Sequence, residues 1–418
     1  MAKSRKIPIN ENDFELALVT TVTPYTDTRN RAYPGDAFDG VVRVAAAGYY
    51  GTGVLLFDGR AVLTAAHLFT NGSYSATVHF ETEAGDQSVS SSQVSLHSNY
   101  DPVDQNHDLA LVWLTSSAPT QAERHNLYRD SDEIGRVFSF AGYGVPGTGD
   151  GGTLDNFSSA PLRLKASNRF DVEAAVLKTH FGSGLAWDPA EGSQLIADFD
   201  NGSANNDALG RLIDRYDLGL GLNEGLISPG DSGGPAFIDG LVAGVASYTA
   251  SLSQGQVYPD IDGSINSSFG EIAAWQRISH YQQWIDQSLR ANDPNAPTKP
   301  DAVIKAQNEG NSGTSTTYFL LQFTGVRDTP DQWLSVDYAT RDGTAKAGED
   351  YIAVHGKLIL YPDENQAVIP VELIGDYFAE PDETFYLDVT HPVGGSFGEG
   401  VAMLTAMRTL INDDVPWF

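Results

Sequence analysis

The sequence predicts an all-β protein that is divided into two domains. The chain has 418 residues, which is too long for one ordinary hydrophobic core, and 41% of them are hydrophobic, as in globular proteins. Short apolar runs rich in Val, Leu and Phe recur from residue 41 onward, each bounded by Gly, Asp or Asn, and such runs are typical of β-strands. ANDPNAPTKP, 291–300, predicts a stiff linker between the domains because it holds three prolines among small polar residues.

The first domain contains the runs VVRVAAA, GTGVLLF, RAVLTAA, ATVHF, DLALVWL and RVFSFAGYG, whose spacing favours a β-barrel or β-sandwich. Residues 145–230 are rich in Gly, Asn, Asp and Ser and predict long surface loops. Residues 273–290 carry apolar side chains near helical spacing and predict an amphipathic helix. These side chains are Trp275, Ile278, Tyr281, Ile285 and Leu289.

Residues 1–31 are polar and weakly patterned, and we interpret them as a leader or pro-segment. The start, MAKSRK, is basic, but no continuous apolar stretch follows it, so it does not resemble a secretory signal peptide. The most apolar stretch, 41–69, is interrupted by Arg43, Asp58 and Arg60. We therefore expect no membrane span.

The chain is strongly acidic and lacks cysteine. It has 55 Asp and Glu against 25 Lys and Arg, a formal net charge of −30, and such a surface repels phosphate backbones, so we expect no nucleic-acid partner. The absence of cysteine excludes disulfides, thiolate nucleophiles and cysteine-ligated metals. A divalent cation would relieve the repulsion among the acids, and a solvated acidic surface is the simpler alternative.

The second domain shows alternating patterns in TTYFLLQF, LSVDYAT, GKLILY, AVIPVEL and TFYLDVT. Alternation of apolar and polar residues places one face of each strand in a core. The patterns predict a separate antiparallel β-sandwich over residues 301–414.

A serine stands between glycines in GDSGGP, 230–235, just before the apolar run LVAGVAS. Glycine lets the backbone turn tightly, which exposes the Ser232 hydroxyl and directs the amides of Gly230 and Ser232 at one point. Two such amides stabilise a tetrahedral oxyanion. A lone serine in a Gly-rich turn is usually only part of a turn, so this motif needs partners to indicate catalysis.

Two other segments supply those partners. A serine hydroxyl needs an adjacent base to act as a nucleophile at neutral pH. LTAAH ends with His67 after an apolar strand, and DLALVWL begins with Asp108 at the head of another. A buried acid of this kind fixes the imidazole tautomer and stabilises the imidazolium.

LTAAH, DLALV and GDSGGP, in this order, resemble the three signature segments of the trypsin/chymotrypsin family of serine proteases over roughly residues 32–290. The resemblance implies a double β-barrel with a C-terminal helix and a site in the cleft between the barrels. It also implies Ser232 as the nucleophile, His67 as the general base and acid, and Asp108 as the orienting carboxylate. This chemistry needs no cofactor.

The same resemblance implies which residues form the primary substrate pocket. The residue six before the nucleophile is Leu226, where relatives that cleave after Arg or Lys have Asp. SYT, 247–249, resembles the strand that pairs with the substrate, so Ser247 and Thr249 are assigned to the pocket wall, and Thr249 narrows the entrance because it replaces the usual Gly. We predict a small or medium apolar residue before the scissile bond, unless the long loop 250–270 reshapes the pocket.

Residues 31–35, Arg-Ala-Tyr-Pro-Gly, weakly resemble the family's activation junction. Cleavage after Arg31 would free the amine of Ala32, which in the family pairs with the acid before the nucleophile, here Asp231. We therefore include activation at this bond as a hypothesis.

Residues 301–414 closely resemble a Calx-β domain, through NEG, VDYATRDGTAKAGEDY, GDYFAEPDETF and INDD. Acids gathered at one tip of a sandwich repel each other unless a cation intervenes, and calcium accepts six to eight oxygen ligands. The alternative is an acidic tip that binds no ion and only aids solubility. The positions that match calcium ligands of the family are Glu309, Asp350, Asp376, Glu380, Glu383, Asp413 and Asp414.

Together these features predict a secreted serine endopeptidase that acts on protein or peptide substrates through an acyl-enzyme. The acidity, the lack of cysteine and the Calx-β-like segment resemble bacterial proteins exported by type I systems, so we expect an extracellular or cell-surface location, with a cell-surface or extracellular-matrix component as a further partner. The alternative is an adhesion or display protein whose protease domain is self-processing or inactive. An α/β-hydrolase is disfavoured because its triad runs in the order Ser, acid, His.

Overall fold

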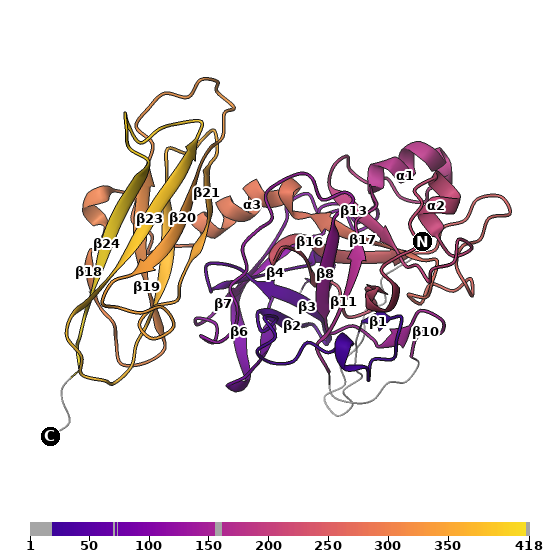
Figure 1. Ribbon diagram of the computed structural model, residues 1–418, viewed down its shortest axis with the longest axis horizontal. Coiled ribbons are helices and arrows are strands. Elements are labelled where there is room, and N and C mark those ends of the chain that lie inside the picture. Colours follow the sequence, from indigo (N-terminus) through magenta and orange to yellow (C-terminus); the bar gives the residue numbers. More distant parts are fainter. Residues whose placement is uncertain (1–18, 70–71, 73, 155–160, 415–418) are drawn as a thin grey trace. The chain divides into compact units, whose positions relative to one another are not determined.

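The computed structural model describes residues 19–69, 72, 74–154 and 161–414. The chain forms two compact units (Figure 1). The first unit extends to Gln282 and the second begins at Gln283, with Phe57–Gly59 assigned to the second. Both units consist mainly of strands with a few short helices, so the predicted all-β fold class is confirmed.

The first half of the first unit is a closed six-stranded barrel in the order β2-β3-β4-β7-β6-β5, with antiparallel neighbours throughout. Val42 and Val44 of β2 are fully buried while Arg43 between them is partly exposed, which is the alternation expected of a strand with one face in a core. The strands are Val41–Ala46 (β2), Tyr49–Leu55 (β3), Ala61–Thr64 (β4), Thr77–Thr82 (β5), Gly85–Leu96 (β6) and Ala110–Leu114 (β7).

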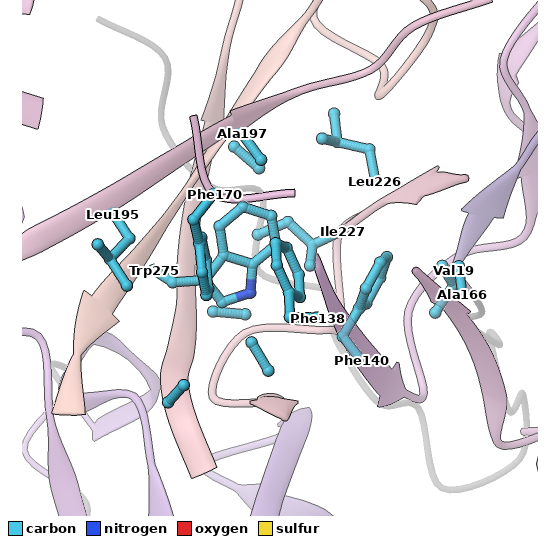
Figure 2. Packing of buried hydrophobic residues seen from close by; sticks show 14 of the residues in the cluster. Val19, Phe138, Phe140, Ala166, Phe170, Leu195, Ala197, Leu226, Ile227 and Trp275 are labelled. Carbon is cyan, nitrogen blue, oxygen red and sulfur yellow. The ribbon is translucent and has the colours of Figure 1, made fainter. Parts of the chain in front are cut away.

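The second half is a seven-stranded antiparallel sheet in the order β11-β8-β15-β16-β17-β13-β12. Figure 2 shows the aromatic cluster that fills its core. Phe138 and Phe170 stack with ring centroids 4.0 Å apart, and Trp275 meets Phe138 edge to face at 5.0 Å. The strands are Val137–Gly142 (β8), Leu164–Arg169 (β11), Val172–Glu173 (β12), Gln194–Asp198 (β13), Pro235–Ile238 (β15), Leu241–Ala250 (β16) and Ile272–Arg277 (β17).

The segment 19–31 is built into the first unit through a small sheet in the order β10-β9-β1-β14. Thr20 and Thr21 are fully buried, and the buried side-chain amide of Asn30 donates to Thr21 Oγ1 at 3.1 Å. The earlier part of the predicted leader or pro-segment, 1–18, lies outside the described residues, and cleavage after Arg31 stays a prediction. The strands are Thr20–Thr21 (β1), Gly147–Thr148 (β9), Gly152–Thr153 (β10) and Gly225–Leu226 (β14).

The closing helix α3 (Ile278–Ala291) begins later than predicted. The predicted helix started at residue 273, but Ile272–Arg277 forms β17, which is buried at every position. Strands β16 and β13 pair with the two edges of β17, and this tertiary pairing overrides the local helical pattern. Within 278–290 the predicted apolar face is buried at Ile278, Tyr281, Ile285 and Leu289.

Residues 145–230 are more ordered than the prediction of long surface loops allowed. They contain strand β11, the fully buried strand β13, and the helices α1 (Ala174–Phe181) and α2 (Ala208–Ile213). The composition did not reveal β13 because its polar residues Gln194 and Asp198 are buried within the sheet.

The second unit is a β-sandwich, as predicted. A five-stranded sheet, β18-β24-β23-β20-β21, and the pair β19-β22 share one core, in which the rings of Tyr351 and Phe385 stack at 4.3 Å. Pro300–Ala302 forms a short 3₁₀ turn at the end of the predicted linker. The strands are Ala306–Asn308 (β18), Thr314–Gln322 (β19), Leu334–Asp342 (β20), His355–Leu360 (β21), Gln366–Ile374 (β22), Glu383–Val393 (β23) and Met403–Ile411 (β24).

Candidate active site

His67 and Asp108 lie together because strands β4 and β7 pair side by side, with Thr64 opposite Ala110. His67 Nδ1 lies 2.7 Å from Asp108 Oδ2, and the backbone amide of His67 donates to Oδ1 at 2.8 Å. Both side chains are buried. A carboxylate oxygen that accepts makes Nδ1 the donor of this bond, which orients the ring with Nε2 on the side away from Asp108.

Ser247 provides a third hydrogen bond to the same carboxylate. Its hydroxyl donates to Asp108 Oδ2 at 2.6 Å and accepts from Gln276 Nε2 at 3.3 Å. The sequence pattern places Ser247 in the substrate pocket and gives no sign of this contact with Asp108. The bond adds a fixed donor to a fully buried acid, which holds the carboxylate in one orientation.

The turn that carries Ser232 is tight, with φ values of 99° at Gly230 and 86° at Gly233. Both lie in the left-handed region that glycine adopts without strain. The Ser232 carbonyl accepts from the amide of Thr52 at 2.8 Å, and the Gly230 carbonyl accepts from the Thr52 hydroxyl at 2.9 Å. Within the described part of the chain, neither the Gly230 amide nor the Ser232 amide donates to a protein acceptor, which leaves both for a ligand.

Packing brings this turn against the segment that ends in His67. A Cβ on Gly233 would lie 2.1 Å from Thr64 Oγ1 and 2.8 Å from the amide nitrogen of Ala65. A Cβ on Gly51 would lie 2.6 Å from Cδ1 of Leu68, the residue after His67, and 2.7 Å from the Ser232 carbonyl oxygen. The two glycines thus permit a close approach between the serine turn and the histidine segment.

Asp231, next to Ser232, is buried and accepts from the backbone amides of Gly144 at 2.7 Å and Ser228 at 2.8 Å. Burial outweighs these bonds and raises the pKa of Asp231 to about 7. The amide of Ala32, which would become the new amine after cleavage at Arg31, donates to the Arg163 carbonyl at 3.0 Å. In the uncut chain the two groups of the hypothetical activation pair therefore have separate partners.

The other predicted pocket residues lie on two strands. Leu226 in β14 is fully buried and packs into the apolar cluster of Figure 2 with Val19 and Phe140. Thr249 in β16 is partly exposed and stands opposite Ala273 of β17. Leu226 is thus a core residue of this apolar cluster, and its place in the substrate pocket stays a prediction.

The acids predicted to bind calcium in the second unit form two groups. One group is Glu309, Asp376 and Asp414, and the other is Asp350, Glu380 and Glu383; within each, carboxylate oxygens lie within 4.8 Å of one another. Asp413 belongs to neither group and accepts instead from Asn308 Nδ2 and the Gly310 amide, each at 3.2 Å.

The first of these groups is electrostatically strained. Burial, followed by the charges of Asp376 and Asp414, raises the pKa of Glu309 to about 7. Glu309 Oε1 and Asp414 Oδ2 are buried and have no hydrogen-bond partner among the described residues. Oxygen atoms in this state suit a hard cation.

A third group of acids, Asp198, Asp200 and Asp207, lies in the first unit, and the sequence analysis missed it. The available signal was the run DFDNGSANND, 198–207, in which three acids fall within ten residues. That run lies in the region that was predicted to be surface loop, so burial of its acids was not expected.

Comparison with known proteins supports the assignment of both units. The model of the Trypsin family matches residues 29–170, which include His67 and Asp108 but end before the serine turn. The model of the Calx-beta domain matches residues 320–414. The chain therefore contains a trypsin-family domain followed by a Calx-beta domain.

Curated proteins that are similar to this chain include sodium/calcium exchangers. Sodium/calcium exchanger 2 of Mus musculus is 29% identical over 153 residues, which cover 30% of this chain and 17% of the exchanger. The Homo sapiens exchanger 2 is 37% identical over 92 residues (19% of this chain, 10% of the exchanger), and the Drosophila melanogaster exchanger Calx is 36% identical over 84 residues (20% and 8%). The chain thus spans less than a fifth of the length of these relatives. Among the described residues, no helix has the length and apolar character needed to cross a membrane.

Proposed function

We propose that this protein is a serine endopeptidase with Ser232 as nucleophile, His67 as general base and acid, and Asp108 as orienting carboxylate. The observation that carries the proposal is the convergence of three donors on the buried Asp108 carboxylate, two from His67 and one from Ser247. Few structural roles require a buried acid to hold one imidazole in a single orientation beside a tight serine turn.

In the proposed reaction, His67 Nε2 accepts the proton of Ser232 Oγ as that oxygen forms a bond to the scissile carbonyl carbon. The carbonyl oxygen becomes an oxyanion, which the amides of Gly230 and Ser232 stabilise. The imidazolium, stabilised by Asp108, then gives its proton to the amine nitrogen as the C–N bond breaks. A water molecule repeats these steps on the acyl-enzyme, which releases the acid product and restores Ser232.

We propose a preference for a small or medium apolar residue before the scissile bond. Leu226 offers no charge to pair with Arg or Lys, and burial of a cationic side chain without a counter-charge is costly. Thr249 carries a side chain where a glycine would leave more room. A peptide-library profile dominated by Arg or Lys at that position would disprove this preference.

We further propose that the Calx-beta domain binds calcium through the two acidic groups, with Glu309 and Asp350 as their most buried members. Support comes from the buried, unpartnered oxygens of Glu309 and Asp414. Calcium titration of the Asp376→Asn/Asp414→Asn variant tests the first group. This variant should bind one calcium ion fewer per chain than the wild type.

We propose that the enzyme acts on protein substrates outside the cell or at its surface, where the Calx-beta domain contacts a surface or matrix component. The formal charge of −30 suits a calcium-rich, extracellular setting, because calcium binds clustered carboxylate oxygens.

Casein hydrolysis by the full chain tests the enzymatic assignment. The wild type should release peptides, Ser232→Ala should lose nearly all activity, and Ser253→Ala, an exposed serine outside the site, should retain it. Equal activity of wild type and Ser232→Ala would refute the proposal, and inactivity of a folded wild type would favour the adhesion or display alternative.

A further inference from the structure

Three buried acids converge in the first unit, away from the proposed triad. Asp198 ends strand β13, Asp200 follows two residues later, and Asp207 is the N-cap of helix α2. Their side chains are only 2%, 3% and 1% exposed. One carboxylate oxygen from each lies within 4.8 Å of those from the other two.

Backbone amides satisfy only part of this group. Asp198 Oδ2 accepts from the amide of Leu209 at 2.8 Å, and Asp207 Oδ1 accepts from the amide of Gly210 at 2.6 Å. Asp200 Oδ1 and Asp207 Oδ2 are buried and have no hydrogen-bond partner among the described residues. A buried carboxylate oxygen without a partner is costly, so these two atoms need a ligand or a proton.

The surroundings add negative charge to the group. In the described part of the chain, no lysine or arginine forms an ion pair with Asp198, Asp200 or Asp207, and Arg169 pairs instead with Asp217 at 2.7 Å. The buried carboxylate of Glu224 adds to the negative charge, because it lies against the backbone amide of Asp200. A positive ion bound here would therefore offset several charges at once.

We propose that Asp198, Asp200 and Asp207 bind a divalent cation, and that this cation is calcium. The three ligands offer only hard carboxylate oxygens, which suit calcium, whereas zinc sites usually include His or Cys. Ligand oxygens at about 2.4 Å from one calcium ion lie no more than about 4.8 Å apart, and the three oxygens meet this limit. The site is separate from the two acidic groups of the Calx-beta domain.

Hydrogen bonds connect the site to strand β14, which carries the predicted pocket residue Leu226. The amide of Asp200 donates to Glu224 Oε1 at 2.7 Å, and Glu224 directly precedes β14 (Gly225–Leu226). The side-chain amide of Asn168 donates to the carbonyls of Asp198 at 2.8 Å and Gly225 at 3.0 Å. A bound ion would therefore fix the loop 199–207 against β14 and stabilise the protease unit itself.

Calcium titration by calorimetry tests the site in the full chain. Every protein carries Ser232→Ala to prevent self-digestion, together with Asp350→Asn/Asp376→Asn/Asp414→Asn to disable the Calx-beta groups. This background should bind one calcium per chain after EDTA treatment and dialysis. Adding Asp200→Asn/Asp207→Asn should abolish that binding at about 1 mM calcium. This concentration exceeds a dissociation constant in the micromolar range by about 100-fold or more. Equal binding by both proteins, or no binding by the background, would overturn the proposal.

The matched control is Asp214→Asn, an exposed residue just after α2 whose left-handed backbone (φ 60°) suits Asn. It should bind calcium as the background does. In EDTA, the Asp200→Asn/Asp207→Asn protein should melt at or above the melting temperature of the background, because the repulsion among the three carboxylates is relieved. Addition of calcium should raise the melting temperature of the background and of Asp214→Asn, but not that of Asp200→Asn/Asp207→Asn. If two acids of this group share a proton instead of binding an ion, calcium should change the melting temperature of none of these proteins. That result would contradict the proposal.

Hydrogen exchange on the background protein keeps the proposal testable if the Asn variants fail to fold. Calcium should slow amide exchange in residues 198–210 at least tenfold, because the loop can open only after the ion leaves. Unchanged exchange in this segment would overturn the proposal. None of these measurements depends on peptidase activity, so the metal site and the proposed enzyme can fail independently.

Discussion

Replacement of Asp108 by Asn perturbs the orientation of the candidate base while preserving the shape of the side chain. Three donors point at the Asp108 carboxylate: the amide of His67 at 2.8 Å, the ring Nδ1 of His67 at 2.7 Å and the hydroxyl of Ser247 at 2.6 Å. An Asn side chain has one acceptor oxygen, and its NH₂ group must face at least one of these donors. The ring can relieve the clash by accepting at Nδ1, which moves its proton to Nε2.

The expected loss of activity is large because protonated Nε2 cannot accept the proton of Ser232. Enzymes with a serine, histidine and aspartate triad lose about 10⁴-fold in kcat after this substitution. This loss corresponds to about 5.4 kcal/mol of transition-state stabilisation, at about 1.36 kcal/mol for each factor of ten. We expect a loss of the same order for Asp108→Asn at neutral pH.

The assay is hydrolysis of a chromogenic peptide with Ala or Val before the scissile bond, measured for wild type and Asp108→Asn. Asp130→Asn, an exposed acid outside the site, is the control and should keep wild-type kinetics. Circular dichroism and a thermal melt establish that the variant is folded. Activity of folded Asp108→Asn within tenfold of the wild type would refute the role assigned to this carboxylate.

Three further substitutions test packing and burial. Ser247→Ala should lower the free energy of unfolding by about 2 kcal/mol in a denaturant titration, because it removes a hydrogen bond to the buried Asp108. Gly233→Ala should melt several degrees lower and lose activity, because the new Cβ would lie 2.1 Å from Thr64 Oγ1 at a φ of 86°. Glu271→Gln should become more stable relative to the wild type as pH rises, because burial raises the pKa of Glu271 from 4.5 to about 7.

The sign of the Glu271 effect follows from its raised pKa. The folded wild type binds the proton more tightly than the unfolded chain, so ionisation destabilises it progressively between about pH 4.5 and pH 7, and the cost is constant above that range. Full ionisation at a pKa raised from 4.5 to 7 costs on the order of 3 kcal/mol. The difference in the free energy of unfolding between Glu271→Gln and the wild type should therefore grow by on the order of 3 kcal/mol between about pH 4.5 and pH 7.

Each of these three variants has a matched control. Ser253→Ala and Glu191→Gln change exposed residues, and Gly240→Ala changes a glycine with φ 79° and no atom within 4 Å of the new Cβ. A Ser247→Ala or Gly233→Ala protein as stable as its control would contradict the packing described above. A pH profile of Glu271→Gln that parallels that of Glu191→Gln would contradict the burial argument.

The candidate triad could be predicted from sequence because its signals are local. The backbone of the Ser232 turn requires glycine at Gly230 and Gly233, and Gly233 and Gly51 allow the turn to approach the segment that ends in His67. The contact between Ser247 and Asp108 could not be predicted, because it joins residues 139 positions apart that meet only when the second sheet forms.

Misread segments share one physical cause, which is that tertiary contacts reversed the local signal. Residues 273–277 have a helical apolar pattern, but pairing with β16 and β13 extends them. The run 198–207 has the composition of a surface loop, but its three acids are buried. Their burial depends on contacts made in the folded protein, which composition does not reveal.

The most direct test of the account is labelling with a fluorophosphonate, which reacts with a serine only when an adjacent base activates it. Peptide mapping by mass spectrometry should find the label on Ser232 in the wild type, and His67→Ala should remain unlabelled. A label on another serine, or equal labelling of Ser232 in His67→Ala, would contradict the claim that these segments converge into one catalytic site.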